Sequence, residues 1–438
     1  MSLLRKLDRF SSAGPGSRSA SNSVEALSNH GPPSRASATS GMEPEASTRF
    51  LSGSDPSDSE SNHELPGLMQ ETAYGPVRVI DTRLEPSHRY GSVLVQSALQ
   101  VQARTMSMLA LDAELCDLDF SKALFLDTET TGLSGGTGTL PFLVGLAWFE
   151  DRSLRVHQLF LDHPAHEVSL LHCLLEKLRS CSCIITYNGK SFDWPLLRTR
   201  FVMNRIAVVK VPPHLDLLHT GRRVFKRRLG RVRLIDMETH VLGKVREDDV
   251  DGSEIPQIYN DFLHEGTTSP LHAVIEHNSN DLIAMAALLA RLADHLQVPQ
   301  WEDDPRDHLG YAQVAERAGK QDTAQLFACA SAAGSEPSCV VDAHLLVART
   351  ARRSGDRDLE ESSLRSALEA GDEARHPFVH LALAKCYEHR FRNYEQALYH
   401  AAFTGSAEGA HSSIRRRKRL ERKIARCVQP KAVELPLR

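Results

Sequence analysis

The order of strand and helix patterns between residues 123 and 203 constrains the fold of this chain more than any other feature. Residues 142–149 and 154–161 are predicted strands, and the four residues between them, Glu150-Asp151-Arg152-Ser153, suit a hairpin. Further strands are predicted at 123–126 and 183–187, with helices at 167–178 and 192–203. Leading strands followed by helix–strand–helix units predict an α/β fold, a mixed sheet with helices on its faces.

Composition separates the N-terminal segment from this block, and a lead-in joins the two. Residues 1–70 are rich in Ser, Gly and Pro and nearly empty of aromatic residues, so we expect disorder, because such a segment cannot bury enough apolar surface. Residues 71–120 are a lead-in with an edge strand around Val77–Ile80 and a helix over 97–116. The α/β domain is expected to span residues 71–296.

The pattern is purely helical after residue 305. Gly334, Gly371 and Gly405 follow one another at intervals of 37 and 34 residues, close to the length of a helical-pair repeat. We therefore expect an all-α, tetratricopeptide-like domain over 307–410, with a plain helical bundle as the alternative. Residues 411–438 form a basic tail.

Charge and cysteine content exclude several classes of protein. The chain of 438 residues has 52 Lys and Arg against 56 Asp and Glu, a formal net charge of -4, so any nucleic-acid binding must come from a local patch. It has no apolar run of the ~18 residues that a membrane span needs. Its eight cysteines include no C-x-x-C pair, which argues against a structural zinc site and fits a reducing cytoplasm.

Two acidic residues follow an apolar strand in the segment Leu124-Phe125-Leu126-Asp127-Thr128-Glu129. Because side chains alternate along a strand, Asp127 and Glu129 point to the same side, roughly 7 Å apart. Two carboxylates so placed would repel each other and take up protons unless a cation lies between them. The alternative is a capping acid followed by a surface acid.

Two later segments strengthen the case for a metal site. Asp193 follows a predicted strand and turn at the start of a helix, and His277 and Asp281 are four residues apart on one helix face. With Asp127 and Glu129 this gives four carboxylates at the ends of a strand, a turn and a helix. Oxygen ligands of this kind suit Mg²⁺ or Mn²⁺.

These segments carry a family resemblance. Asp127-x-Glu129, Asn188-x-x-x-Phe192-Asp193 and His277-x-x-x-Asp281 resemble, in order, the three motifs of the DEDD 3′–5′ exonucleases. More narrowly, the chain resembles the YprB-type ribonuclease H-like family over about residues 74–296. That resemblance rests on the string from Asp127 through Gly132 to Gly145, on Asp216-Leu217-Leu218-His219, on Asp249-x-x-Gly252-Ser253-Glu254-Ile255-Pro256 with Tyr259 beyond, and on His277-Asn278.

The resemblance implies a ribonuclease H-like fold and a mechanism with two Mg²⁺ or Mn²⁺ ions. Asp127 would bridge both ions, Glu129 and Asp281 would complete the site on the nucleophile side, and Asp193 would hold the second ion through water. His277 would be the general base. It stands, however, at the spacing of the exonuclease branch that uses tyrosine, so a supporting hydrogen-bond donor or a structural helix histidine is the alternative.

Other residues are candidates for nucleic-acid contact. Asn188 and Phe192 belong to the second motif. A basic cluster without an intervening acid, Arg222, Arg223, Lys226, Arg227 and Arg228, suits a phosphate backbone, although a solvated helix face is the alternative. The run from Arg415 to Arg426 is either a nucleic-acid arm or the polar face of a terminal helix.

The sequence therefore favours a metal-dependent nuclease, acting 3′–5′ on single strands of DNA or RNA. The same metal chemistry permits endonuclease action, and a non-catalytic nucleic-acid-binding or scaffold protein with the same fold is the rival. A repeat domain of this kind typically binds peptides or proteins, so a protein partner there is a further expectation.

Overall fold

The computed structural model describes residues 64–132, 138–207, 211–297, 299 and 303–428. The strands are β1 (Leu68–Thr72), β2 (Gly75–Leu84), β3 (Arg89–Tyr90), β4 (Val93–Leu94), β5 (Leu124–Thr130), β6 (Pro141–Glu150), β7 (Ser153–Phe160), β8 (Ile184–Thr186) and β9 (His214–Asp216). The α-helices of the α/β part are α1 (Ala103–Ala110), α2 (Glu167–Ser180), α3 (Asp193–Met203), α4 (Leu217–Leu229), α5 (Leu234–Met237), α6 (Ile255–Glu265) and α7 (Ser269–Asp294).

The remaining helices are α8 (Pro305–Arg317), α9 (Gln321–Ala332), α10 (Pro337–Ser354), α11 (Arg357–Glu369), α12 (His376–Cys386), α13 (Tyr394–Ala401) and α14 (Ala410–Val428). Short 3₁₀ turns are η1 (Val95–Gln100), η2 (Ala113–Leu115), η3 (Phe120–Lys122), η4 (Pro164–His166) and η7 (Gly405–Ala407), and π turns are η5 (Glu238–Leu242) and η6 (Tyr387–Phe391).

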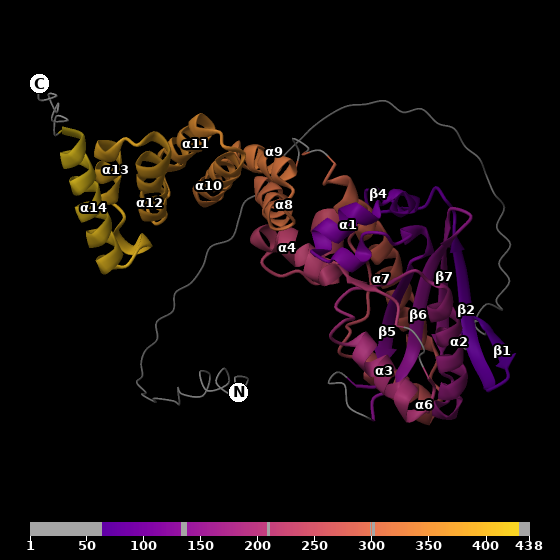
Figure 1. Cartoon of the computed structure of the whole chain (residues 1–438). Helices are drawn as coiled ribbons and strands as arrows, with labels where there is room; N and C mark the ends of the chain where they lie inside the picture. The colour runs from indigo at the N-terminus through magenta and orange to yellow at the C-terminus, as the bar shows by residue number, and fades with distance from the viewer. Residues whose placement is uncertain (1–63, 133–137, 208–210, 298, 300–302, 429–438) are drawn as a thin grey trace, which may run out of the picture. The chain divides into compact units, whose positions relative to one another are not determined.

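A mixed sheet forms the centre of the α/β part (Figure 1). Within the described residues it has seven strands in the order β1-β2-β7-β6-β5-β8-β9. Strand β5 pairs antiparallel with β6 and parallel with β8, and β8 pairs parallel with β9. The predicted mixed α/β sheet is thus confirmed, and β5 lies between its antiparallel and parallel parts.

The predicted hairpin is confirmed, with a turn two residues shorter than the four predicted. Glu150 pairs with Ser153, and the two residues between them, Asp151 and Arg152, both have positive φ, 47° and 69°. Two-residue turns with both φ angles positive match the twist of antiparallel strands. Strand β5, by contrast, does not end before the acids as predicted but runs through them to Thr130.

Two predictions for the lead-in are wrong in detail. The strand around Val77–Ile80 is not at the edge, because β1 and β7 flank β2. The predicted helix over 97–116 is three short pieces, η1, α1 and η2. Leu111 ends α1 in the left-handed conformation at φ 54°, and Asp112 caps η2 by accepting from the backbone N–H of Glu114, so the chain turns where a helix would continue.

Two apolar cores cover the two faces of the sheet. Leu124 and Leu126 of β5 pack with α2, α3, α6 and the start of α7, whereas Phe125 packs on the other face with α4 and the second half of α7. This division follows from the alternation of side chains along a strand. Asp127 and Glu129 continue the face of Phe125, where α7 crosses the sheet.

The residues after 305 form consecutive packed helices, and Gly334, Gly371 and Gly405 follow α9, α11 and α13 as predicted. Helices α8–α10 share their core with the α/β part. A Cβ on Gly310 of α8 would lie 2.3 Å from the carbonyl oxygen of Val224 in α4, so these two helices approach closely. A separate core joins α10–α14.

Most of the segment predicted to be disordered, residues 1–63 of 1–70, lies outside the described residues, as do residues 429–438 of the basic tail. In the part of the chain that the structure describes, helices are too short or too polar to cross a membrane.

Candidate functional site

Asp127 and Glu129 lie inside β5, on the side of the sheet that α7 crosses. Asp127 is paired across the ladder with Gly145 of β6, which in turn is paired with Gln158 of β7. The register shifts between Glu129 and Thr130, a bulge that ends regular pairing just after the second acid. The predicted placement of both carboxylates on one side thus follows from the strand geometry.

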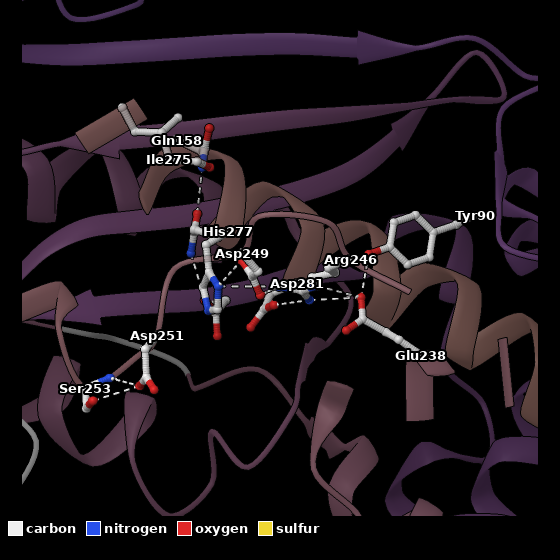
Figure 2. A network of polar contacts seen from close by, with 12 residues as sticks. Tyr90, Gln158, Glu238, Arg246, Asp249, Asp251, Ser253, Ile275, His277 and Asp281 are labelled. Carbon is white, nitrogen blue, oxygen red and sulfur yellow. Dashed lines mark hydrogen bonds and ion pairs between the residues drawn. The ribbon is translucent and has the colours of Figure 1, made fainter. Parts of the chain in front are cut away.

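Asn278 of α7 fixes Asp127 in place. Its Nδ2 donates to Asp127 Oδ2 at 2.7 Å, and its Oδ1 accepts from Gln158 Nε2 at 2.9 Å. Gln158 also donates to the carbonyl of Ile275 at 2.8 Å (Figure 2). Because Asn278 and Gln158 are buried, these hydrogen bonds define both the orientation of the Asn278 amide and that of the Asp127 carboxylate.

Asp193 is the first residue of α3 and points at β5. Its Oδ1 accepts a 2.6 Å hydrogen bond from the Thr128 hydroxyl. The turn before it is held by Asp216, whose carboxylate accepts from the backbone N–H groups of Asn188 at 2.8 Å and Lys190 at 3.1 Å. Asn188 itself has a positive φ of 69°, which asparagine tolerates better than most residues. Asp216 thus positions the turn that carries Asp193.

Asp281 and His277 on α7 belong to a network centred on Arg246 (Figure 2). The Arg246 side chain is 5% exposed and pairs with Asp281, with Glu238 at 2.9 Å and with Asp249 at 3.2 Å. Asp249 Oδ1 also lies within hydrogen-bonding distance, 2.8 Å, of His277 Nδ1. The hydroxyl of Tyr90 donates to Glu238, which extends the network into the core.

The carboxylates influence one another strongly. Burial, followed by the charges of Asp281, Asp193 and Glu129, raises the pKa of Asp127 well above its ordinary value. Burial and the charges of Asp281 and Asp193 do the same for the pKa of Glu129. Burial raises the pKa of Asp193 to about 6, although the hydrogen bond from Thr128 opposes the shift. Asp127 and Glu129 therefore lie within the electrostatic reach of Asp193 and Asp281.

The donor chemistry fits a hard divalent cation, because the acids offer oxygen atoms only. Asp127 and Asp193 each use one carboxylate oxygen in a side-chain hydrogen bond from Asn278 or Thr128. Within the described residues, no three His, Cys, Asp or Glu side chains lie close enough together to bind one metal ion as they stand. Asp281 is engaged by Arg246 instead.

The predicted nucleic-acid contacts are only partly exposed. Phe192, directly before Asp193, is 60% exposed. In α4, Arg227 pairs with Asp342 at 2.6 Å and Arg228 with Asp307 at 2.7 Å, so these two guanidinium groups hold α4 against α8 and α10. Arg222 and Lys226 form no ion pair with a described carboxylate, and burial lowers the pKa of Arg223.

Comparison with known proteins places the chain in a family. It is 30% identical over 366 residues to YprB of Bacillus subtilis strain 168, a protein described as uncharacterized, and the match covers 81% of this chain and 86% of YprB. The chain belongs to the YprB family. Residues 124–293 also match the RNase_H superfamily, and this stretch includes β5, Asp193 and α7 up to Ala293.

Among solved structures, the chain is similar to a family B DNA polymerase from the archaeon Pyrobaculum calidifontis. The TM-score is 0.32 and the sequence identity 14%, over 52% of this chain and 29% of the polymerase, so the chain spans less than a third of that protein.

Sequence reasoning missed several residues of this YprB-family site. Arg246 lies in the loop between η5 and α6, where no periodicity or motif singles it out. Gln158 sits inside a strand whose pattern is otherwise apolar. Asn278, Asp249 and Asp216 belong to the strings that resemble the family, and their place in those strings, with His277, Gly252 and His219, is the signal that could have identified them.

Proposed function

We propose that this YprB-family chain is a metal-dependent nuclease that hydrolyses phosphodiester bonds, 3′–5′ and on single strands. The observation that carries the proposal is the set of four carboxylates from β5, α3 and α7: the charges of Asp281 and Asp193 raise the pKa values of Asp127 and Glu129, and burial raises that of Asp193. Mutually repelling, partly buried acids destabilise a folded chain unless a cation offsets their charge. Because such a cluster lowers the stability of the fold, a functional role explains its presence better than a structural role does.

Asp127, Glu129, Asp193 and Asp281 are the residues that would hold two Mg²⁺ or Mn²⁺ ions. Such ions, when bound, stabilise the attacking and leaving oxygens of a phosphoryl displacement. Asn278 keeps one oxygen of Asp127 occupied, and Thr128 does the same for Asp193. One oxygen of each of these two carboxylates is thus held in a fixed position.

His277 has the surroundings of a general base. A carboxylate next to Nδ1, here Asp249 at 2.8 Å, favours the tautomer with the proton on Nδ1. The other ring nitrogen, Nε2, then accepts the proton of an attacking water. Arg246 contacts both Asp249 and Asp281, so it couples the orientation of the base to that of an acid.

Phe192 and the basic residues of α4 would bind the substrate. An exposed aromatic ring beside Asp193 provides a surface on which an unpaired base can stack. Arg222 and Lys226 are the α4 cations available for phosphates, since Arg227 and Arg228 are engaged by Asp342 and Asp307.

One observation favours the rival function, a nucleic-acid-binding protein without catalysis. Arg246 already supplies a positive charge to Asp281, and the described residues include no gathered ligand group. The nuclease would cleave a bound strand, whereas the non-catalytic protein would leave it intact.

The test is digestion of single-stranded DNA and RNA, each labelled at the 3′ or the 5′ end, by the full-length protein with Mn²⁺ or Mg²⁺. The proposed function predicts early loss of the 3′ label and a shrinking 5′-labelled ladder, both absent for Asp193→Ala. Internal cuts would correct the mode to endonucleolytic. Strands that bind and stay intact with every ion would support the rival.

A further inference from the structure

Helix α14 carries an unusual charge. Between residues 410 and 428 it has one acid, Glu421, and eight basic residues. These are Arg415, Arg416, Arg417, Lys418, Arg419, Arg422, Lys423 and Arg426. The structure divides all of them except Arg417 between two faces with different surroundings.

One face holds α14 onto the preceding helices. The buried carboxylate of Glu388 accepts from Arg419 at 2.7 Å and from Lys423 at 2.9 Å, and Arg416 pairs with Glu408 at 3.0 Å. Burial alone would raise the pKa of Glu388, but these hydrogen bonds hold it at about 2. With the buried Leu420 between them, these cations have a structural role.

The other face is a stripe formed by Arg415, Lys418, Arg422 and Arg426, which we call the α14 stripe. Steps of three, four and four residues place these side chains on one side of a helix. All four are exposed. Among the described residues none of them pairs with a carboxylate, and Arg422 donates only to the carbonyl of Lys418 at 3.1 Å.

Such a stripe destabilises the helix that carries it. Like charges three or four residues apart repel each other, whereas solvated helix faces usually interleave acids and bases. An anion bound along the helix would offset this repulsion. From Arg415 to Arg426 the helix rises about 16 Å, which is the axial length of about five phosphates in one strand of a B-form duplex.

We propose that the α14 stripe binds the phosphate backbone of nucleic acid, as a contact separate from the carboxylate site. The class of ligand rests on the proposed function. The formal net charge of the chain is -4, so this attraction is local to the helix. An anionic membrane fits less well, because Ile414 is the only large apolar side chain that the described part of α14 exposes, and a membrane-bound helix inserts an apolar face.

The experiment measures binding of a fluorescent 30-nucleotide single-stranded RNA, and of the matching DNA, to the full-length protein in EDTA, across a NaCl series. The variant carries Arg415→Gln, Lys418→Gln, Arg422→Gln and Arg426→Gln. We expect affinity at about 100 mM NaCl to fall by about tenfold or more, and the slope of log K against log salt to fall by about 3. Because the four residues are exposed, the thermal unfolding temperature should stay within a few degrees of the wild type.

The matched control removes the same charge elsewhere, with Arg83→Gln, Arg104→Gln, Arg179→Gln and Arg352→Gln, which are exposed residues on four other elements. It should keep the wild-type slope. Wild-type binding by the stripe variant, or an equal loss in the control, would overturn the proposal. So would a stripe variant that loses binding to phosphatidylserine vesicles but keeps its affinity for both strands.

The outcomes also separate this proposal from the nuclease. A stripe-dependent salt slope in a protein that hydrolyses nothing with Mn²⁺ supports the stripe and contradicts the nuclease. A stripe variant that hydrolyses strands and binds them as wild type does would support the nuclease and contradict the stripe.

Discussion

The side-chain oxygen of Asn278 occupies the space where a Cβ of Gly145 would be. A Cβ built on Gly145 lies 2.1 Å from Asn278 Oδ1 and 2.8 Å from its Cγ. Because Asn278 is fully buried and hydrogen-bonded on both sides, it has no room to move away. The absence of a side chain at Gly145 is therefore what allows α7 to reach Asp127 across β6.

Gly145→Ala should displace Asn278 and release Asp127. We expect the free energy of unfolding to fall by about 1–3 kcal/mol, as for other overpacked cores. Hydrolysis should fall further than stability alone explains, because the carboxylate loses its hydrogen bond. Urea unfolding and a hydrolysis assay below the unfolding transition measure the two effects. Gly252→Ala is the control, since a Cβ there meets no atom within 4 Å; equal behaviour of the two variants would contradict the account.

The cation-free protein should lose stability as the pH rises through the pKa of Asp193. That pKa is raised from 3.8 to about 6, so the folded state binds the proton more tightly than the unfolded state. The resulting stability is fully present below about pH 4 and is lost as the pH passes 6. In EDTA, wild type should weaken between pH 4 and 7 relative to Asp193→Asn. A constant difference between the two proteins would show that Asp193 titrates normally.

Arg246 should be needed for folding as well as for activity. Its replacement by Met leaves Glu238 and Asp281 without their cation, and breaking a buried pair in this way costs about 3–5 kcal/mol. Adding Glu238→Gln should recover part of the loss, because one unpaired charge is removed. Chemical unfolding of the single and double variants tests this. A single variant as stable as wild type would mean that the network contributes little.

His277→Ala should slow hydrolysis by about 10²–10⁴-fold, the usual contribution of a general base, while Mn²⁺ affinity changes little. Calorimetric Mn²⁺ titration alongside single-turnover kinetics measures both quantities. His277→Gln is a useful companion, because its amide can still hydrogen-bond to Asp249. Parallel losses of turnover and Mn²⁺ affinity in both variants would assign His277 a structural role.

The sequence was most informative where structure is local. Asp127 and Glu129 share a side because strand side chains alternate, and the hairpin follows from two strand patterns separated by a short polar segment. Strand β9 has three residues, too few for an alternating pattern to be recognised in the sequence. The helix predicted over 97–116 is interrupted at Leu111, whose left-handed conformation a leucine side chain does not predict.

The site depends on contacts between residues far apart in the chain. Asn278 meets Asp127 and Gln158 only because α7 crosses three strands, and no local pattern encodes that crossing. Arg246 approaches Asp281 from an irregular loop. Arg227 and Arg228 look like phosphate ligands in the sequence, and only the packing of α4 on the later helices shows their partners, Asp342 and Asp307.

The central claim is that the Asp127 cluster is a metal site that cleaves phosphodiester bonds. The most direct measurement is the initial rate of Mn²⁺-dependent hydrolysis of a single-stranded oligonucleotide by wild type, Asp127→Asn and Asp81→Asn, all shown to be folded. Asp81 is a carboxylate on β2 that pairs with Arg155, away from the cluster. The account predicts hydrolysis that stops in EDTA, is lost in Asp127→Asn and persists in Asp81→Asn. Undiminished hydrolysis by a folded Asp127→Asn protein would contradict it.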